Sequence, residues 1–146
     1  MPTVHDLDQL AALVEHTQAS LFVRWSRGPE HDLGDLGDAS RDELTGVPLP
    51  GLSANPLAVE PWWVDRSRVL WVARRLYDYS HLRRQRGPGI RAWVLEGTVV
   101  GRGPDNEPLV NCERPVAWIA DEVLRQALRV VGAQPADQWG PMDRTT

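Results

Sequence analysis

The chain has 146 residues, of which 42% are hydrophobic and seven are tryptophan, enough for one well-packed core but short for two domains. The net charge of −4 gives no overall case for nucleic acid as a partner. The charge is uneven, because residues 1–65 carry 11 acids and 3 arginines whereas residues 66–102 carry 9 arginines and 2 acids. A basic middle segment can pair with the acidic front of the chain or present one positive face to an anionic ligand.

The first two elements are a helix and a strand. Residues 6–18 predict a helix, because Asp6 can cap it, Gln9 can complete a capping box, and apolar residues recur at helical spacing. Residues 20–28 predict a strand by their aromatic and β-branched content. Arg24 lies within this strand between apolar neighbours. Because a buried arginine is costly unless it is paired, Arg24 either reaches solvent at a sheet edge or serves a site.

A long acidic segment follows. Residues 28–50 are rich in glycine and proline and predict a loop, with one helical turn possible at 40–44. A loop of this length in a small domain is either functional, for example as a lid, or a mobile surface loop. Residues 51–54 then predict a short strand end that carries Ser53.

The next segment changes from turn to helix. Asn55-Pro56 predicts the start of a short helix that ends near Pro61. Trp62 and Trp63 are expected in the core, with one of them forming a pocket wall.

Residues 65–82 predict the longest helix, capped by Asp65 and apolar along one broad face that includes Tyr77. A basic loop follows at 81–89. Arginines beside tyrosines can grip nucleic acid, but cations near a helix C-terminus are also favourable with the helix dipole, and this second interpretation is preferred.

The stretch 101–110 reads Gly-Arg-Gly-Pro-Asp-Asn-Glu-Pro-Leu-Val and predicts a tight turn between strands at 91–100 and 107–112. Asp105 and Glu107 stand on either side of Asn106, so the alternation of side chains along a strand would point both carboxylates to the same side. A loop that presents two carboxylates on a rigid scaffold is a candidate catalytic site. The alternative is a solvated hairpin turn.

The chain ends in a predicted helix and a tail. Residues 121–131 predict the last helix, with Leu124 and Leu128 among its inward residues. We expect residues 1–132 to form a single domain and 133–146 a loosely ordered tail, with Trp139 as a possible anchor.

Other site types lack support. The single Cys112 excludes a multi-cysteine zinc site, and the four histidines show no metal-ligand spacing, so we expect no metal. No apolar run approaches the length of a membrane span, and no signal-peptide pattern is present. The sequence therefore predicts a soluble cytoplasmic protein with no membrane partner.

The order of Arg24 on the first strand, Ser53 at the second block and Asp105-Asn106-Glu107 before a late strand resembles ADP-ribosyltransferases of the Arg–Ser–Glu type. The resemblance implies an α+β fold, a small single domain with a split antiparallel sheet flanked by helices. It implies NAD as cofactor, held by Arg24 and Ser53, with Glu107 and Asp105 as the catalytic carboxylates. Trp62 and Tyr77 would wall the cofactor site. The full Ser-Thr-Ser triplet of that family is absent, since the chain has Leu52-Ser53-Ala54. The whole chain also resembles an actinobacterial family of unknown activity.

The chemistry implied by this resemblance is cleavage of the nicotinamide–ribose bond, in which a carboxylate stabilises positive charge developing on the ribose. Two alternatives stay open. The first is a non-catalytic accessory protein whose Trp-lined cleft engages a partner protein or a small anionic ligand. The second is nucleic-acid binding through residues 74–91, and the acidic isoelectric point of about 5.5 counts against it.

Overall fold

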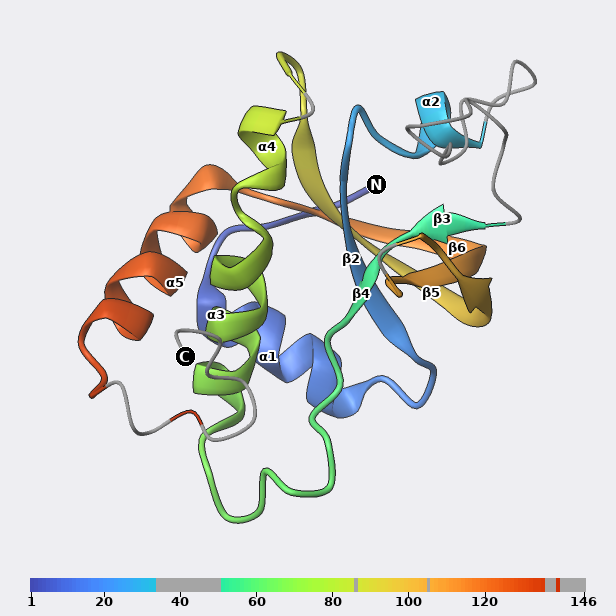
Figure 1. Ribbon diagram of the computed structural model, residues 1–146. Helices are drawn as coiled ribbons and strands as arrows, with labels where there is room; N and C mark the ends of the chain where they lie inside the picture. Colours follow the sequence, from blue (N-terminus) through green and yellow to red (C-terminus); the bar gives the residue numbers. More distant parts are fainter. Residues whose placement is uncertain (34–50, 86, 105, 136–138, 140–146) are drawn as a thin grey trace.

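The computed structural model describes residues 1–33, 51–85, 87–104, 106–135 and 139. In the protein, helices pack against one face of a curled sheet. Figure 1 shows α1, α3 and α5 gathered on one side of the sheet and α2 on the other. In chain order the elements are β1 Thr3–Val4, α1 Leu7–His16, β2 Leu21–Ser26, α2 Pro29–Asp32, β3 Leu52–Ser53, β4 Asn55–Pro56, α3 Arg68–Tyr79, α4 Leu82–Gln85, β5 Arg91–Arg102, β6 Pro108–Ile119 and α5 Asp121–Gly132.

The sheet is built around the long hairpin of β5 and β6. The strand order is β1-β6-β5-β2-β4, and β3 also pairs with β6. Register shifts interrupt the β5–β6 ladder at three places, and such bulges bend a strand and increase its twist. The predicted mixture of helices and strands in a small domain is confirmed. The prediction of a split antiparallel sheet needs correction, because the described strands form one sheet and β1 runs parallel to β6.

The segment from β3 to β4 connects two distant strands of the curled sheet. Ser53 in β3 is in register with Leu109 of β6, whereas Asn55 in β4 is in register with Val23 of β2. The chain thereby crosses the inside of the curl and covers a second, smaller core. This core is made of Phe22, Leu52, Ala54, Trp93, Leu95 and Val110.

The main core lies between the other sheet face and the helices. Strand alternation sends Leu21, Val23 and Trp25 of β2 to this side and the residues between them into the curl. Each long helix contributes completely buried side chains, such as Leu10 of α1 and Val123 of α5. The apolar periodicity of these helices is thus explained by one shared core.

The beginning of α1 follows the predicted capping chemistry. The Asp6 carboxylate accepts a hydrogen bond from the backbone N–H of Asp8, at 2.7 Å. The side chain of Gln9 reaches back to the N–H of His5, one residue before the cap, at 3.2 Å. The first turn therefore satisfies donors that would otherwise lack a partner.

Two predictions between the strands and α3 are wrong. Asn55-Pro56 does not start a helix but forms β4 against β2, and proline is tolerated there because β4 is the last strand on that side of the described sheet. The cap of α3 is Ser67, whose hydroxyl accepts from the N–H of Leu70, and not Asp65, which has a positive φ of 54°. The helix also ends at Tyr79, and α4 follows as a separate short helix.

Near the C-terminus, β6 is longer than predicted and α5 is placed correctly. β6 continues through Pro115 to Ile119, because the register shift between Val94 and Leu95 of β5 accommodates the proline. Leu128 of α5 was expected to point inward, but it is 57% exposed. It lies at the border of the apolar face, next to a groove described below.

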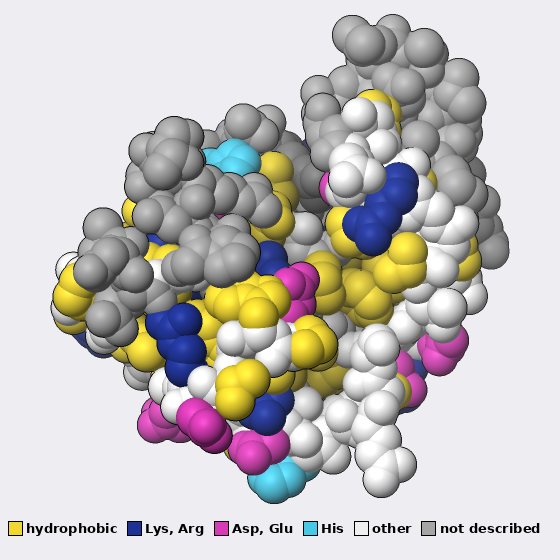
Figure 2. All heavy atoms as spheres, turned by 60° about the horizontal axis from the view of Figure 1, so that its bottom comes forward, with side chains coloured by type: hydrophobic (Ala, Val, Ile, Leu, Met, Phe, Trp, Pro, Cys, Tyr) yellow, Lys and Arg dark blue, Asp and Glu magenta, His cyan; other side chains and the backbone are white. Residues whose placement is uncertain are grey.

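Four tryptophans pack together beside α3. Trp62, Trp63 and Trp71 contact one another edge to face, and Trp139 stacks on Trp63 with ring centroids 6.2 Å apart. Figure 2, which turns the lower side of Figure 1 forward, shows hydrophobic side chains exposed among arginine and acidic ones. Trp139 thus anchors its part of the chain in the main core, while the possible lid and turn at 34–50 and the rest of the tail beyond 135 lie outside the described residues.

Candidate functional site

Arg24 sits in a buried polar network inside the curl of the sheet. Its Nε donates to Asp32 Oδ2 at 2.6 Å, and both side chains are almost completely buried. The Ser26 hydroxyl donates to the same carboxylate oxygen at 2.5 Å and accepts from Trp93 Nε1 at 2.9 Å. Arg24 therefore does not reach solvent at a sheet edge but has its charge neutralised by a buried carboxylate.

Asp32 reaches the network because Gly28 directs α2 over the sheet. Gly28 has a φ of 121°, in the region that favours glycine, and its N–H donates to the Ser26 hydroxyl at 3.1 Å. A Cβ at this position would overlap the indole ring of Trp118. The close approach of Gly28 to this ring holds α2 and its carboxylate against the strand.

Ser53 contacts Arg24, and Glu107 precedes the strand that pairs with Ser53. Arg24 Nη1 donates to the backbone carbonyl oxygen of Ser53 at 2.8 Å. Ser53 is in register with Leu109, two residues after Glu107. Glu107 is half-buried in the hairpin turn, where its carbonyl accepts from the N–H of Gly103 at 2.9 Å. The structure thus brings Arg24 and Ser53 into contact and puts Glu107 at the start of the neighbouring strand. Asp105 lies outside the described residues.

Trp62 and Tyr77 are not part of this neighbourhood. Tyr77 lines a groove together with Trp25, and Trp25 points to the opposite sheet face from its neighbour Arg24. Trp62 packs on the main core, and its Nε1 donates to Glu60 at 2.5 Å. The expected arrangement of these two rings as a wall beside Arg24 is therefore not seen.

The geometry of Arg24 limits what it can bind. Two of its donor nitrogens already point to Asp32 and to the Ser53 carbonyl. An anionic ligand that displaced Asp32 from Arg24 would leave a carboxylate buried without its partner. This arrangement favours a role for Arg24 in holding β2, α2 and β3 together.

Cys112 packs against the second core from β6. Burial raises the pKa of its thiol, and the negative charges of Asp32 and Glu113 raise it further, against a lowering backbone hydrogen bond at Arg114. The thiol is therefore protonated at neutral pH and a poor nucleophile.

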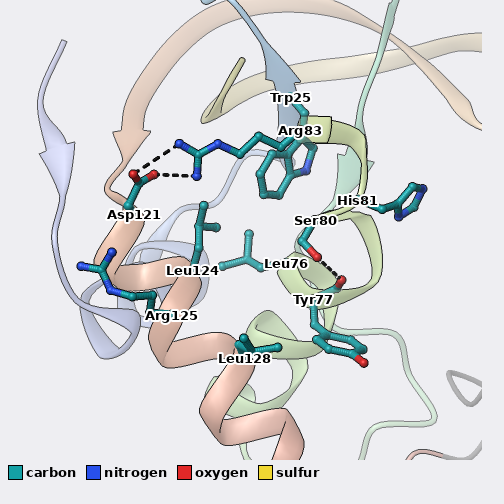
Figure 3. Close-up of a pocket in the computed structure, with 10 residues that line it drawn as sticks. All are labelled: Trp25, Leu76, Tyr77, Ser80, His81, Arg83, Asp121, Leu124, Arg125 and Leu128. Atoms are coloured by element: carbon teal, nitrogen blue, oxygen red, sulfur yellow. Dashed lines mark hydrogen bonds and ion pairs between the residues drawn. The ribbon is translucent and has the colours of Figure 1, made fainter. Parts of the chain in front are cut away.

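A groove opens on the helical side, between α5 and the end of α3 with α4. Its volume is about 490 Å³. Figure 3 shows Leu76 and Leu124 facing each other across it, with Trp25 at the end near Arg83 and with Tyr77 and Leu128 at the other end. Trp25 and Leu76 are 1% exposed, so they form a floor, whereas Tyr77 and Leu128 are exposed side walls.

Charged side chains border the end of the groove at which Trp25 lies. Arg83 Nη1 lies 2.9 Å from Asp121 Oδ1, and this exposed pair spans from α4 to the first residue of α5. Arg125 lies one turn further along α5, lines the same groove, and makes no ion pair within the described residues. The arginine and aspartate side chains of the groove together carry about one positive charge at neutral pH.

Two features common in other proteins are not found in the described part of the chain. No group of three or more His, Cys, Asp or Glu side chains there could hold a metal ion. Among the same residues, no helix is long and apolar enough to cross a membrane.

A model described as a family of unknown function (DUF6098) matches residues 1–140. The chain belongs to this family. No curated protein and no solved structure matches the chain. The DUF6098 match includes both the Arg24 network and the groove, so both lie in the part of the chain that characterises the family.

Sequence reasoning missed the groove, although some of its signals were present. Trp25 alternates with Arg24 on β2, which already places its ring on the helical side. Leu128 and Arg125 mark the border of the apolar face of α5. The distance between α5 and α3 could not be predicted from the sequence, because it depends on how both helices pack on the sheet.

Proposed function

We propose that this protein is a non-catalytic binding protein that takes a small monoanionic ligand with an apolar body into the groove between α3, α4 and α5. The observation that carries the proposal is an apolar floor bordered by arginines in one concavity. Its volume of about 490 Å³ lies within the range of about 300–1,000 Å³ usual for small-molecule sites.

The apolar part of the ligand would lie on Leu76 and Leu124, with Trp25 at its end. Burying these surfaces against an alkyl or aryl body removes apolar area from water. The exposed edges of Tyr77 and Leu128 would cover the other end of the ligand. Side chains on facing helices are a common way to build such sites in helical layers.

The anionic part would meet Arg125. Among the described residues Arg83 shares its charge with Asp121, whereas Arg125 makes no ion pair and can offer its donors to a ligand. A carboxylate or similar group can accept two parallel hydrogen bonds from one guanidinium, which fixes its orientation.

The hydrogen bonds of the groove favour binding over catalysis. Ser80 Oγ donates to the Tyr77 carbonyl at 2.9 Å, so this hydroxyl proton is held by the backbone and not by a base. His81 Nδ1 lies 3.1 Å from the Asp78 carbonyl, which accounts for one of its ring nitrogens. Activation of a nucleophile requires a hydrogen bond to a base, and these two contacts supply none.

The test compares three probes that share one alkyl chain: octanoate, octanol and octylammonium. We expect octanoate to bind best and octylammonium worst, measured by calorimetry and by amide shifts of α5. Arg125→Ala should weaken octanoate about tenfold, toward the affinity of octanol. Arg129→Ala, which removes an exposed arginine on the same helix outside the groove, should leave it unchanged. Equal affinity for the three probes, or no binding at millimolar concentration, would refute the proposal.

A second candidate function is cleavage of the nicotinamide–ribose bond of NAD near Arg24, Ser53 and Glu107. It is favoured by the contact of Arg24 with Ser53 and by the pairing of β3 beside Glu107. In this reaction the bond from ribose to nicotinamide breaks and water or an acceptor bonds to the ribose carbon. Nicotinamide leaves with the bonding electron pair, the attacking group loses its proton to solvent, and the Glu107 carboxylate stabilises the charge on the ribose.

Nicotinamide release from NAD tests this candidate. Glu107→Gln should lower the rate at least about a hundredfold if the carboxylate stabilises the transition state. Glu113→Gln alters an exposed glutamate on β6, the strand that follows Glu107, whose carboxylate accepts a hydrogen bond from Thr98. It is the matched control and should keep the rate. Absence of NAD binding at millimolar concentration would exclude this candidate and leave the groove as the functional site.

A further inference from the structure

We infer that Trp139 regulates the groove by holding Arg74 against Tyr77, so that anchoring of Trp139 and binding of the anionic ligand strengthen each other. This inference rests on the proposed function of the groove. It concerns a residue far along the chain that does not line the groove.

Arg74 connects the two places directly. Its guanidinium carbon lies 5.0 Å from the Trp139 ring centroid and 5.6 Å from that of Tyr77. The Arg74 side chain is 8% exposed, and its Nε is 2.7 Å from Asp78 Oδ1 on the next turn of α3. Both ring distances are within the reach of a cation–π interaction, which is stronger where water is excluded.

Trp139 is held from its other side by the tryptophan cluster. It is 3% exposed and lies nearly parallel to Trp63, with 12° between the ring planes. The Trp63 ring also carries Arg66, 3.8 Å from its centroid. Trp139 therefore lies in a stack that runs from Arg66 through Trp63, Trp139 and Arg74 to Tyr77.

Tyr77 is the point where this stack meets the ligand. Its side chain lines the groove yet is 41% exposed, so in the absence of a ligand its orientation depends on its contact with Arg74. Docked Trp139 restricts Arg74, and Arg74 restricts the Tyr77 ring. A wall held in its bound orientation loses less freedom when a ligand packs on it.

Reciprocity follows from thermodynamic linkage. If docked Trp139 raises the affinity of the groove, then a ligand in the groove raises the occupancy of docked Trp139 by the same factor. The two states to be compared are Trp139 docked on Trp63 and Trp139 released from it.

The experiment uses octanoate as the probe and the full chain. Trp139→Ala should weaken octanoate binding about fivefold or more, and Trp139→Phe, which keeps an aromatic face for Arg74, should weaken it less. Trp62→Ala is the matched control: its ring belongs to the same cluster but packs on Trp63 and Trp71, so octanoate affinity should hold. The inference would be overturned if Trp139→Phe, Trp139→Ala and the unaltered protein bound octanoate with equal affinity. The proposed function would still stand in that case, because all three proteins would bind octanoate.

A second readout separates coupling from general loosening of the fold. In the 5-fluorotryptophan-labelled protein, octanoate should shift the ¹⁹F resonance of Trp139, and Tyr77→Ala should abolish the shift. Affinities of Trp139→Phe, Tyr77→Ala and the double variant then form a cycle, and a coupling of about threefold or more supports the inference. Additive effects, or an unshifted Trp139 resonance at saturating octanoate, would contradict it.

Discussion

At the residue scale, Arg24 shows how one polar side chain on a buried strand can be structural. Its partners include Asp32 from α2 and the Ser53 carbonyl from β3. Alternation along β2 predicts that Arg24 lies on the side opposite Trp25, but its partners could not be predicted. Asp32 is one of many acids in an acidic segment, and only the turn at Gly28 selects it.

We expect the buried pair to respond asymmetrically to substitution. Asp32→Ala leaves the Arg24 charge buried without its carboxylate and should lower the free energy of unfolding by about 3–5 kcal/mol. The double variant Arg24→Met with Asp32→Leu removes both charges and should recover most of that loss. Urea denaturation measures both values.

A loss below about 1 kcal/mol for Asp32→Ala would mean that Arg24 does not depend on Asp32 for stability. That result would remove the evidence for a structural role of Arg24 and would strengthen the case for NAD. The comparison therefore bears on stability and function together.

At the element scale, α3 shows which boundaries local sequence can define. Its apolar spacing predicted the helix, because Trp71, Val72 and Leu76 need one common core. Its cap was ambiguous, since Asp65 and Ser67 are both good capping residues. The left-handed backbone of Asp65 sets the direction of approach, and only Ser67 then has its hydroxyl beside a free N–H.

The cap of α3 can be checked by two substitutions at one position. Ser67→Ala removes the acceptor for the Leu70 N–H and should cost about 1 kcal/mol of stability. Ser67→Asp supplies another acceptor at the same place and should cost much less. If Ser67→Ala leaves the thermal midpoint unchanged, the helix is capped elsewhere.

At the scale of the whole molecule, the sequence predicts the three long helices and the central hairpin but not their assembly. Helical and strand periodicities reflect nearest neighbours along the chain, so α1, α5, β2 and the β5–β6 pair were placed from them. The pairing of β4 with β2 depends on a contact between residues far apart in sequence, which explains why Asn55-Pro56 was mistaken for a helix start. The groove likewise exists only after α3 and α5 have packed on the sheet.

The crossing of the chain from β3 to β4 also divides the protein by stability. Few residues in this segment pair with β6 and β2, yet they cover the whole second core, while the main core is secured separately by α1, α3 and α5. Detachment of the segment therefore exposes Phe22 and Trp93 to water while the helical layer stays folded. We therefore expect the inside of the curl to open as a separate cooperative unit, at a lower free energy than global unfolding.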